Sequence, residues 1–280
     1  GCSFVKFFGV SVIGPGQSVG NGIICGSWWH INSPNCTLEN CEGSDTMTGF
    51  RLDADPGAGD NMLYLNDDAH NCSDPYTGGP TGPWNNSDGF SRTLNHAANV
   101  VYRGCRSWFN SDDGWDSIHT AEKITYDGSW SIMNGYSSEG VPYPDGDGNG
   151  FKMGGGTEAA STTVASRIVN RCVAFGNKAN GFDQNDGIFL ATMYNNSSIN
   201  NGLNDWKFGY HQPIYHVLIN NLSYGNAIIG GLTSDADFWI HNHNTWNGAV
   251  TVDAGDFINL TASEFLADRQ TNGNLPIINA

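Results

Sequence analysis

Acidic residues gather in one short stretch of this 280-residue chain, and their spacing is typical of a divalent-cation site. Asp112, Asp113 and Asp116 lie within five residues, where three carboxylates repel one another unless a cation binds between them. Calcium accepts about six to eight hard oxygen ligands in irregular geometry, so such a turn suits it. Asp88 lies 24 residues before Asp112, about one unit of the repeat described below, and we expect the two to be neighbours. The alternative is a solvated acidic turn, which the additional carboxylate of Asp88 disfavours.

Lys152 is the second candidate for chemistry, because it lies in the glycine-rich sequence GNGFKMGGG at 148–156. We expect it about two coils beyond the carboxylates of 112–116. Small residues around a cation let a polymer approach closely, although an ordinary exposed lysine is the alternative. The preceding DGDGNG at 145–150 begins like an EF-hand loop, yet its twelfth position is Gly156 where that loop needs glutamate. We therefore predict a turn, or a weak second calcium site, in place of an EF-hand. Asp183 and Asn185, about one repeat beyond Lys152, are expected to contact substrate or cap a turn.

The elements that must position these residues are short strands in a repeat. Runs of β-favouring residues with alternating apolar and polar positions recur, for example at 36–41, 99–105, 166–172, 216–221 and 238–244. Corresponding positions of successive units are 23 to 26 residues apart, as are Cys172 and Asn195, and Asn195 and Asn221. One unit is too short to bury its apolar face, whereas stacked units can do so. The pattern predicts an all-β protein, a right-handed parallel β-helix that forms a single domain over 1–280. Excursions are expected at about 53–83 and 136–156, flanking the binding face.

Composition narrows the class of protein and its surroundings. Net charge is −16 and glycine is abundant, with 37 residues, so a helical fold and a nucleic-acid partner are both disfavoured. No apolar run is long enough for a transmembrane helix. We expect a secreted, glycosylated monomer, with sequons at Asn35, Asn71, Asn85, Asn195, Asn196, Asn221 and Asn259.

The seven cysteines fall into two groups according to their place in the repeat. Cys41, Cys105 and Cys172 occupy the same place in their units, which favours buried thiols in a core ladder over disulfides. Cys25, Cys36 and Cys72 are better candidates for disulfide bridges, although sequence alone does not give their partners.

Taken together, these segments resemble polysaccharide lyase family 9, whose members include calcium-dependent pectate lyases. The matching sequences are SDGF at 87–90, RGCRS at 103–107, NSDDGWD at 110–116, GNGFKMGGG at 148–156 and GFDQN at 181–185. The resemblance implies that Asp88, Asp112, Asp113 and Asp116 hold Ca²⁺ and that Lys152 is the catalytic base. It also implies that an acidic polysaccharide is bound with the help of Arg106, Asn149, Asp183 and Asn185.

The implied reaction is β-elimination in a uronate polymer, with pectate or polygalacturonate as the expected substrate. Lys152 would remove the C5 proton, and calcium on the uronate carboxylate would stabilise the enolate-like charge. A free lysine has a pKa of about 10.4, so we expect the ion and partial burial to lower it. Two alternatives stay open: a β-helical glycoside hydrolase that uses paired aspartates, and a non-catalytic calcium-stabilised glycan-binding or structural β-helix.

Overall fold

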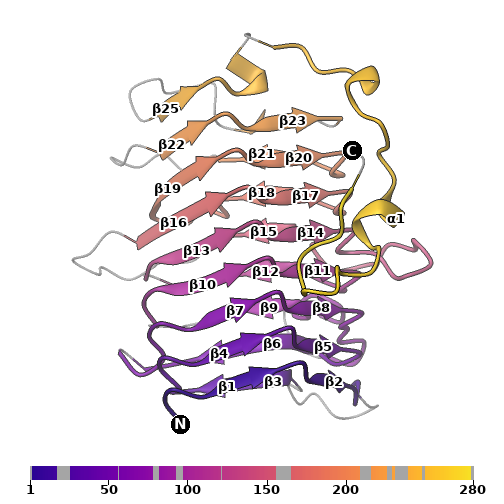
Figure 1. Cartoon of the computed structure of the whole chain (residues 1–280). Helices are drawn as coiled ribbons and strands as arrows, with labels where there is room; N and C mark the ends of the chain where they lie inside the picture. The colour runs from indigo at the N-terminus through magenta and orange to yellow at the C-terminus, as the bar shows by residue number, and fades with distance from the viewer. Residues whose placement is uncertain are drawn as a thin grey trace.

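The computed structural model describes residues 2–17, 26–55, 57–77, 82–92, 97–120, 122–155, 165–208, 216–225, 229–230, 239–247 and 250–278. Within these residues the chain winds through three parallel sheets, one strand of each per coil, and the coils stack from the N-terminus to β25 (Figure 1). Every pairing between named strands is parallel and joins successive coils, as β10 with β13 and β13 with β16. The predicted parallel β-helix is confirmed.

The first sheet has nine strands: β1 (Lys6–Phe8), β4 (Thr37–Glu39), β7 (Leu63–Leu65), β10 (Val100–Arg103), β13 (Ile124–Asp127), β16 (Ala165–Asn170), β19 (Phe189–Tyr194), β22 (His216–Ile219) and β25 (Trp239–Asn242). The second has eight: β2 (Ser11–Ile13), β5 (Glu42–Ser44), β8 (Asp68–His70), β11 (Arg106–Trp108), β14 (Trp130–Ile132), β17 (Val173–Phe175), β20 (Ser197–Ile199) and β23 (Leu222–Tyr224). The third also has eight: β3 (Gly26–Ile31), β6 (Thr48–Asp53), β9 (Phe90–Ser91), β12 (Trp115–Asp116), β15 (Phe151–Lys152), β18 (Phe182–Asp183), β21 (Trp206–Lys207) and β24 (Ile229–Gly230).

The turn between the first and second sheets explains the abundance of asparagine. Asn40, Asn66, Asn195 and Asn220 occupy this turn with φ between 55° and 58°, a conformation that asparagine tolerates better than most residues. The next residue in each coil points inward and forms a buried ladder. The Asn196 carboxamide accepts the backbone N–H of Cys172 at 2.9 Å and donates to the Val169 carbonyl at 3.0 Å.

Asp67 occupies the same ladder position as Asn196 but has a carboxyl group there. Its Oδ1 accepts the Cys41 N–H at 2.8 Å, while Oδ2 is buried and has no hydrogen-bond partner among the described residues. Burial raises the pKa of Asp67 well above its usual range, and the nearby Arg269 only partly opposes this. An amide at this position could donate as Asn196 does, so the aspartate is an unfavourable residue in the ladder at neutral pH.

Changing Asp67 to Asn is expected to raise the free energy of unfolding at neutral pH by about 1–3 kcal/mol. Because the pKa of Asp67 is raised in the folded protein, its protonated carboxyl group contributes fully to the free energy of unfolding below about pH 4. This contribution is lost as the pH rises towards the folded pKa. The advantage of the variant should therefore grow with pH in chemical unfolding at acidic and neutral pH. Asn196→Asp, the reverse change, is the matched control and should destabilise. Equal stability of Asp67→Asn and the parent at every pH would contradict this account.

The C-terminal segment runs back along the second sheet and covers it (Figure 1). It contains η3 (Ala254–Asp256) and α1 (Ala262–Phe265), after η2 (Thr245–Asn247). Phe265 is buried against Trp130 and Phe175, with ring centroids 5.6 and 4.6 Å away. Arg269 forms an ion pair with Asp68 at 2.6 Å. This face of the β-helix is therefore closed by protein and is not the binding face.

Three of the sequence-based expectations need correction or limitation. The predicted excursion at 53–83 contains β7 and β8, which pair in register with the strands of both neighbouring coils. Cys36 and Cys72 are buried free thiols, like Cys41, Cys105 and Cys172, and Cys25 lies outside the described residues. Among the described helices, none is long and apolar enough to cross a membrane.

Candidate metal centre and active site

The third sheet carries the candidate site. In each of its two-residue strands from β9 to β21, one side chain points inward to the core and the other points outward. The inward rings of Phe90, Trp115, Phe151 and Phe182 stack, with centroids 4.8, 4.6 and 4.9 Å apart. This column fixes the strands at successive levels of the β-helix. The outward residues form what we call the strand row: Ser91, Asp116, Lys152, Asp183 and Lys207, each paired in register with the next.

A second line of residues, the turn row, lies just before these strands and consists of Asp88, Asp113, Asn149 and Asn180. Each side chain accepts the backbone N–H of the next member. Asp88 Oδ1 accepts from Asp113 at 3.3 Å, Asp113 Oδ1 from Asn149 at 2.7 Å, and Asn149 Oδ1 from Asn180 at 3.2 Å. The turn row therefore holds its carboxylates in fixed orientations at the edge of the third sheet.

The register corrects two expectations about spacing. Asp88 stands beside Asp113, 25 residues later, and not beside Asp112. Lys152 lies one coil beyond Asp116, not two, because the intervening excursion lengthens that coil, so that Asp113 and Asn149 are 36 residues apart. Both shifts bring the predicted residues closer together than the sequence indicated.

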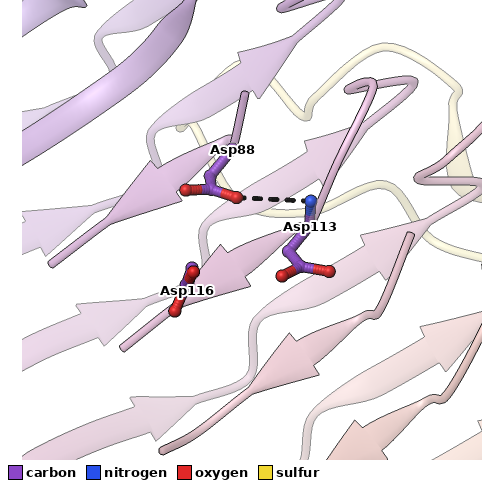
Figure 2. Close-up of side chains that lie close together, drawn as sticks. All are labelled: Asp88, Asp113 and Asp116. Carbon is purple, nitrogen blue, oxygen red and sulfur yellow. Dashed lines mark hydrogen bonds between the residues drawn. The ribbon is translucent and has the colours of Figure 1, made fainter. Parts of the chain in front are cut away.

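The carboxylates converge in two overlapping groups. Asp88, Asp113 and Asp116 are buried, and each offers an oxygen within 4.8 Å of the others (Figure 2). Asp112, Asp113 and Asp147 form the second group under the same limit. All four predicted calcium ligands are therefore adjacent. Asp147 is the fifth acid, which we had considered only as part of the turn or weak second site at 145–150.

Lys152 points its ammonium into this cluster. Its Nζ lies 3.0 Å from Asp113 Oδ2, 3.4 Å from Asp116 Oδ2 and 3.7 Å from Asp147 Oδ2. The lysine side chain is only 11 % exposed, so these contacts act in a poorly solvated environment.

Burial sets the protonation of the cluster. It raises the pKa of Asp88 and Asp112 well above the usual range, and mutual repulsion among the carboxylates adds to the effect. Burial also raises the pKa of Asp113 to about 7, although Lys152 opposes it. For Lys152, burial lowers the pKa, but Asp113, Asp116, Asp112 and Asp88 together raise it well above its usual value. The carboxylates alone thus shift the lysine in the sense opposite to what a base requires.

The donor set fits a calcium ion. Each of the two groups offers hard carboxylate oxygens from two adjacent coils, and neither group contains a sulfur or imidazole ligand. Within the described part of the chain, Asp113 Oδ2 is buried without a hydrogen bond, and the charge that balances it is that of Lys152. A divalent cation would compensate several buried carboxylates that one ammonium compensates incompletely.

The remaining predicted residues divide into two groups. Asn149, Asp183 and Asn185 line one polar cavity beside the carboxylates. Arg106 is not brought to the site, because it lies in β11 of the second sheet. There it pairs with Asp68 at 2.8 Å and donates to the Ala267 carbonyl at 2.7 Å. Its role in this structure is to hold the C-terminal segment.

Sequence reasoning missed Asp147 and Lys207. Asp147 was visible in DGDGNG, but the irregular coil length concealed that its side chain meets Asp112 and Asp113. Lys207 lies 24 residues after Asp183, a normal repeat length, and this spacing could have identified it as the next member of the strand row.

Comparison with known proteins gives concordant matches. Residues 1–226 match the family model described as "Pel9A-like, right handed beta helix region". The chain is 29 % identical over 270 residues to pectate lyase L of Dickeya dadantii (strain 3937), covering 90 % of this chain and 59 % of that protein. It is 31 % identical over 272 residues to pectate lyase L of Paenibacillus polymyxa (strain SC2), covering 91 % and 56 %. The chain thus spans less than two thirds of these curated relatives.

Two solved structures share the fold. A rhamnogalacturonan lyase superposes with a TM-score of 0.82 at 27 % identity, over 96 % of this chain and 68 % of that one. Pectate lyase Pel9A superposes with a TM-score of 0.75 at 29 % identity, over 90 % and 60 %. The family model and these neighbours confirm a right-handed parallel β-helix.

Proposed function

Since the chain belongs to the Pel9A-like, right handed beta helix family, as its resemblance to polysaccharide lyase family 9 predicted, we propose that it is a calcium-dependent polysaccharide lyase that cleaves a uronate polymer by β-elimination. The observation that carries this proposal is a nearly buried lysine, Lys152, directed into a cluster of buried carboxylates on the third sheet. This combination supplies both a cation site and a group that can accept a proton. Pectate or polygalacturonate is the first candidate substrate, by analogy with the relatives named pectate lyase.

The calcium ligands would be Asp88, Asp112, Asp113 and Asp116. When bound there, the ion supplies a Lewis acid for the substrate carboxylate. The turn row contributes orientation, since Asn149 donates through both its backbone and side-chain nitrogens to Asp113 Oδ1, at 2.7 and 2.9 Å. Asp113 Oδ2 is thereby left to face the cluster.

Lys152 would accept the C5 proton of the uronate. Its ammonium is held by Asp113 and Asp116, so release from these carboxylates must accompany loss of its proton. A cation bound by the same carboxylates would weaken that hold and lower the pKa of Lys152, which would reconcile the raised pKa of the lysine with its role as a base.

The proposal is tested by incubating the protein with polygalacturonate and following ultraviolet absorbance of the unsaturated end. We expect absorbance to rise in calcium and to stop rising when a chelator is added. Depolymerisation without absorbance would indicate hydrolysis by paired aspartates, a reading that gives Lys152 no part. Binding of the polymer without depolymerisation would favour a glycan-binding or structural role.

The expected setting of this activity is extracellular, with the protein acting as a monomer. Two of the sequons are poor candidates for glycosylation in the folded protein, because Asn196 and Asn221 are 1 % and 2 % exposed and form the inner ladder. Asn35, Asn71, Asn85, Asn195 and Asn259 are not buried and stay candidates.

A further inference from the structure

A polar cavity of about 410 Å³ adjoins the carboxylate cluster and has no role in proton abstraction as described above. Asp147 and Asn149 form its near wall, Asp183 lies at its centre, and Leu203 and Lys207 form its far wall, one coil further along. Its volume is within the range of small-ligand sites and is enough for a monosaccharide unit. Leu203 is 59 % exposed and offers an apolar surface for the face of a sugar ring.

Two lysines line this cavity, but only one presents its ammonium to a ligand. Lys178 Nζ donates to the carbonyls of Tyr143 and Gly146, both at 2.5 Å, and so fixes the excursion that forms the near wall. Among the residues that the structure describes, Lys207 Nζ has one acceptor, Asp183 Oδ2 at 3.2 Å, and its side chain is 43 % exposed. An ammonium has three donors, so Lys207 can bind a further acceptor without leaving Asp183.

Asp183 does not depend on Lys207 for its hydrogen bonds. Its Oδ1 accepts the Asn185 N–H at 2.6 Å and its Oδ2 accepts the Asn180 carboxamide at 2.8 Å. The lysine is therefore not required to satisfy a buried carboxylate, which distinguishes it from Lys152. The protein has a net charge of −16, and Asp145, Asp147 and Asp183 line the same cavity, so an anionic ligand there would depend on the Lys207 ammonium for its binding.

Building on the proposed lyase function, we propose that this cavity holds the sugar next to the one being cleaved and that Lys207 binds its carboxylate. The centre of the cavity is one coil from Lys152, since Lys152 and Asp183 are register partners. Adjacent coils are about 4.8 Å apart, close to the length of one pyranose unit in an extended chain. The substrate is accordingly a polymer with uronates at neighbouring positions, and not one in which uronates alternate with neutral sugars.

The test is steady-state kinetics at saturating calcium on polygalacturonate and on a rhamnogalacturonan backbone, in which uronates alternate with neutral sugars. For Lys207→Ala we expect KM on polygalacturonate to rise about 10- to 100-fold, as for loss of a charge-assisted hydrogen bond, with a smaller change in kcat. Lys207→Arg should recover most of the affinity. Lys123→Ala, which removes an exposed lysine outside the cavity, should behave as the parent. On the alternating polymer the parent should cleave poorly, and Lys207→Ala should make no further difference.

An unchanged KM for Lys207→Ala on polygalacturonate, even with a lowered melting temperature, would overturn the inference, because it would reduce Lys207 to a structural partner of Asp183. A parent enzyme that prefers the alternating polymer would overturn it too. If the parent forms no unsaturated product from either polymer, the lyase function itself fails, and this inference fails with it.

Discussion

Replacing Lys152 by alanine should lower the rate of polymer cleavage by about 10²- to 10⁴-fold, the usual contribution of a general base. No other lysine lies in the carboxylate cluster among the described residues, since Lys178 and Lys207 are engaged further along the cavity. Initial rates of unsaturated product at saturating calcium measure the effect. Calcium affinity should not fall, because the carboxylates remain and no longer have the lysine ammonium as a competing cation.

Lys152→Arg is the matched control that separates proton abstraction from charge. Arginine keeps a positive charge for Asp113 and Asp116 but does not give up its proton in proteins. We therefore expect the arginine variant to unfold at about the parental temperature in chelator and yet to be as inactive as the alanine variant. Turnover retained by Lys152→Arg would contradict the assignment of the base.

The same assignment fixes how the pH profile responds to calcium. A base is active above its pKa, and the carboxylates raise the pKa of Lys152. Filling the cation site removes part of that raise, so the rising limb of rate against pH should move to lower pH as calcium increases. A limb that stays in place at all calcium concentrations would mean that Lys152 is not coupled to these carboxylates.

Much of the fold could be predicted because short, local sequence patterns define the repeat. A turn residue with positive φ, an inward ladder residue and an alternating strand follow one another in most coils, as at Asn195, Asn196 and β20. The acids of 112–116 and Lys152 also lie on elements with regular strand pairing. Their convergence follows directly from the register of β9, β12 and β15.

Irregular coil lengths and long-range contacts limited the rest. Because the excursion before Asn149 lengthens its coil, repeat spacing did not show that Lys152 lies one coil beyond the carboxylates of 112–116, or that Asp147 approaches Asp113. The role of Arg106 depends on the Phe265 carbonyl, 159 residues away, which no local pattern indicates. Residues positioned by such contacts cannot be found from repeat spacing alone.

A carboxylate that binds calcium but does not stabilise the fold can be identified by replacing it with a neutral side chain. Asp88 is the most suitable residue for this test. It is 4 % exposed, and its Oδ1 accepts the Asp113 N–H, a bond that an asparagine oxygen can also accept. The chain itself places an asparagine, Asn149, at this position two coils on. Asp113 and Asp116 form ion pairs with Lys152 at 3.0 and 3.4 Å, whereas Asp88 acts on the lysine only at longer range, so Asp88→Asn should remove less attraction to Lys152 than a change at either of the other two.

We expect the stabilities of Asp88→Asn and the parent to exchange order with calcium. In chelator at neutral pH the variant should be more stable, by about 1–2 kcal/mol, because burial and the neighbouring carboxylates raise the pKa of Asp88. Because the pKa of Asp88 is raised in the folded protein, its contribution to the stability of the parent is full below about pH 4 and is lost as the pH rises. The difference in stability between Asp88→Asn and the parent should therefore widen from acidic to neutral pH. At a calcium concentration 100 times Kd, binding should add about 2.7 kcal/mol to the stability of the parent. If the variant does not bind the ion, the parent should then be the more stable by about 0.7–1.7 kcal/mol.

Chemical unfolding in chelator and in calcium measures both halves of this exchange. Asp145→Asn removes an exposed charge near the cluster and should shift both conditions equally, if at all. If Asp88→Asn were less stable than the parent in chelator, the carboxylate would be structural. If calcium stabilised both proteins equally, the ion would bind elsewhere, and Lys152 would lose the partner that makes it a usable base.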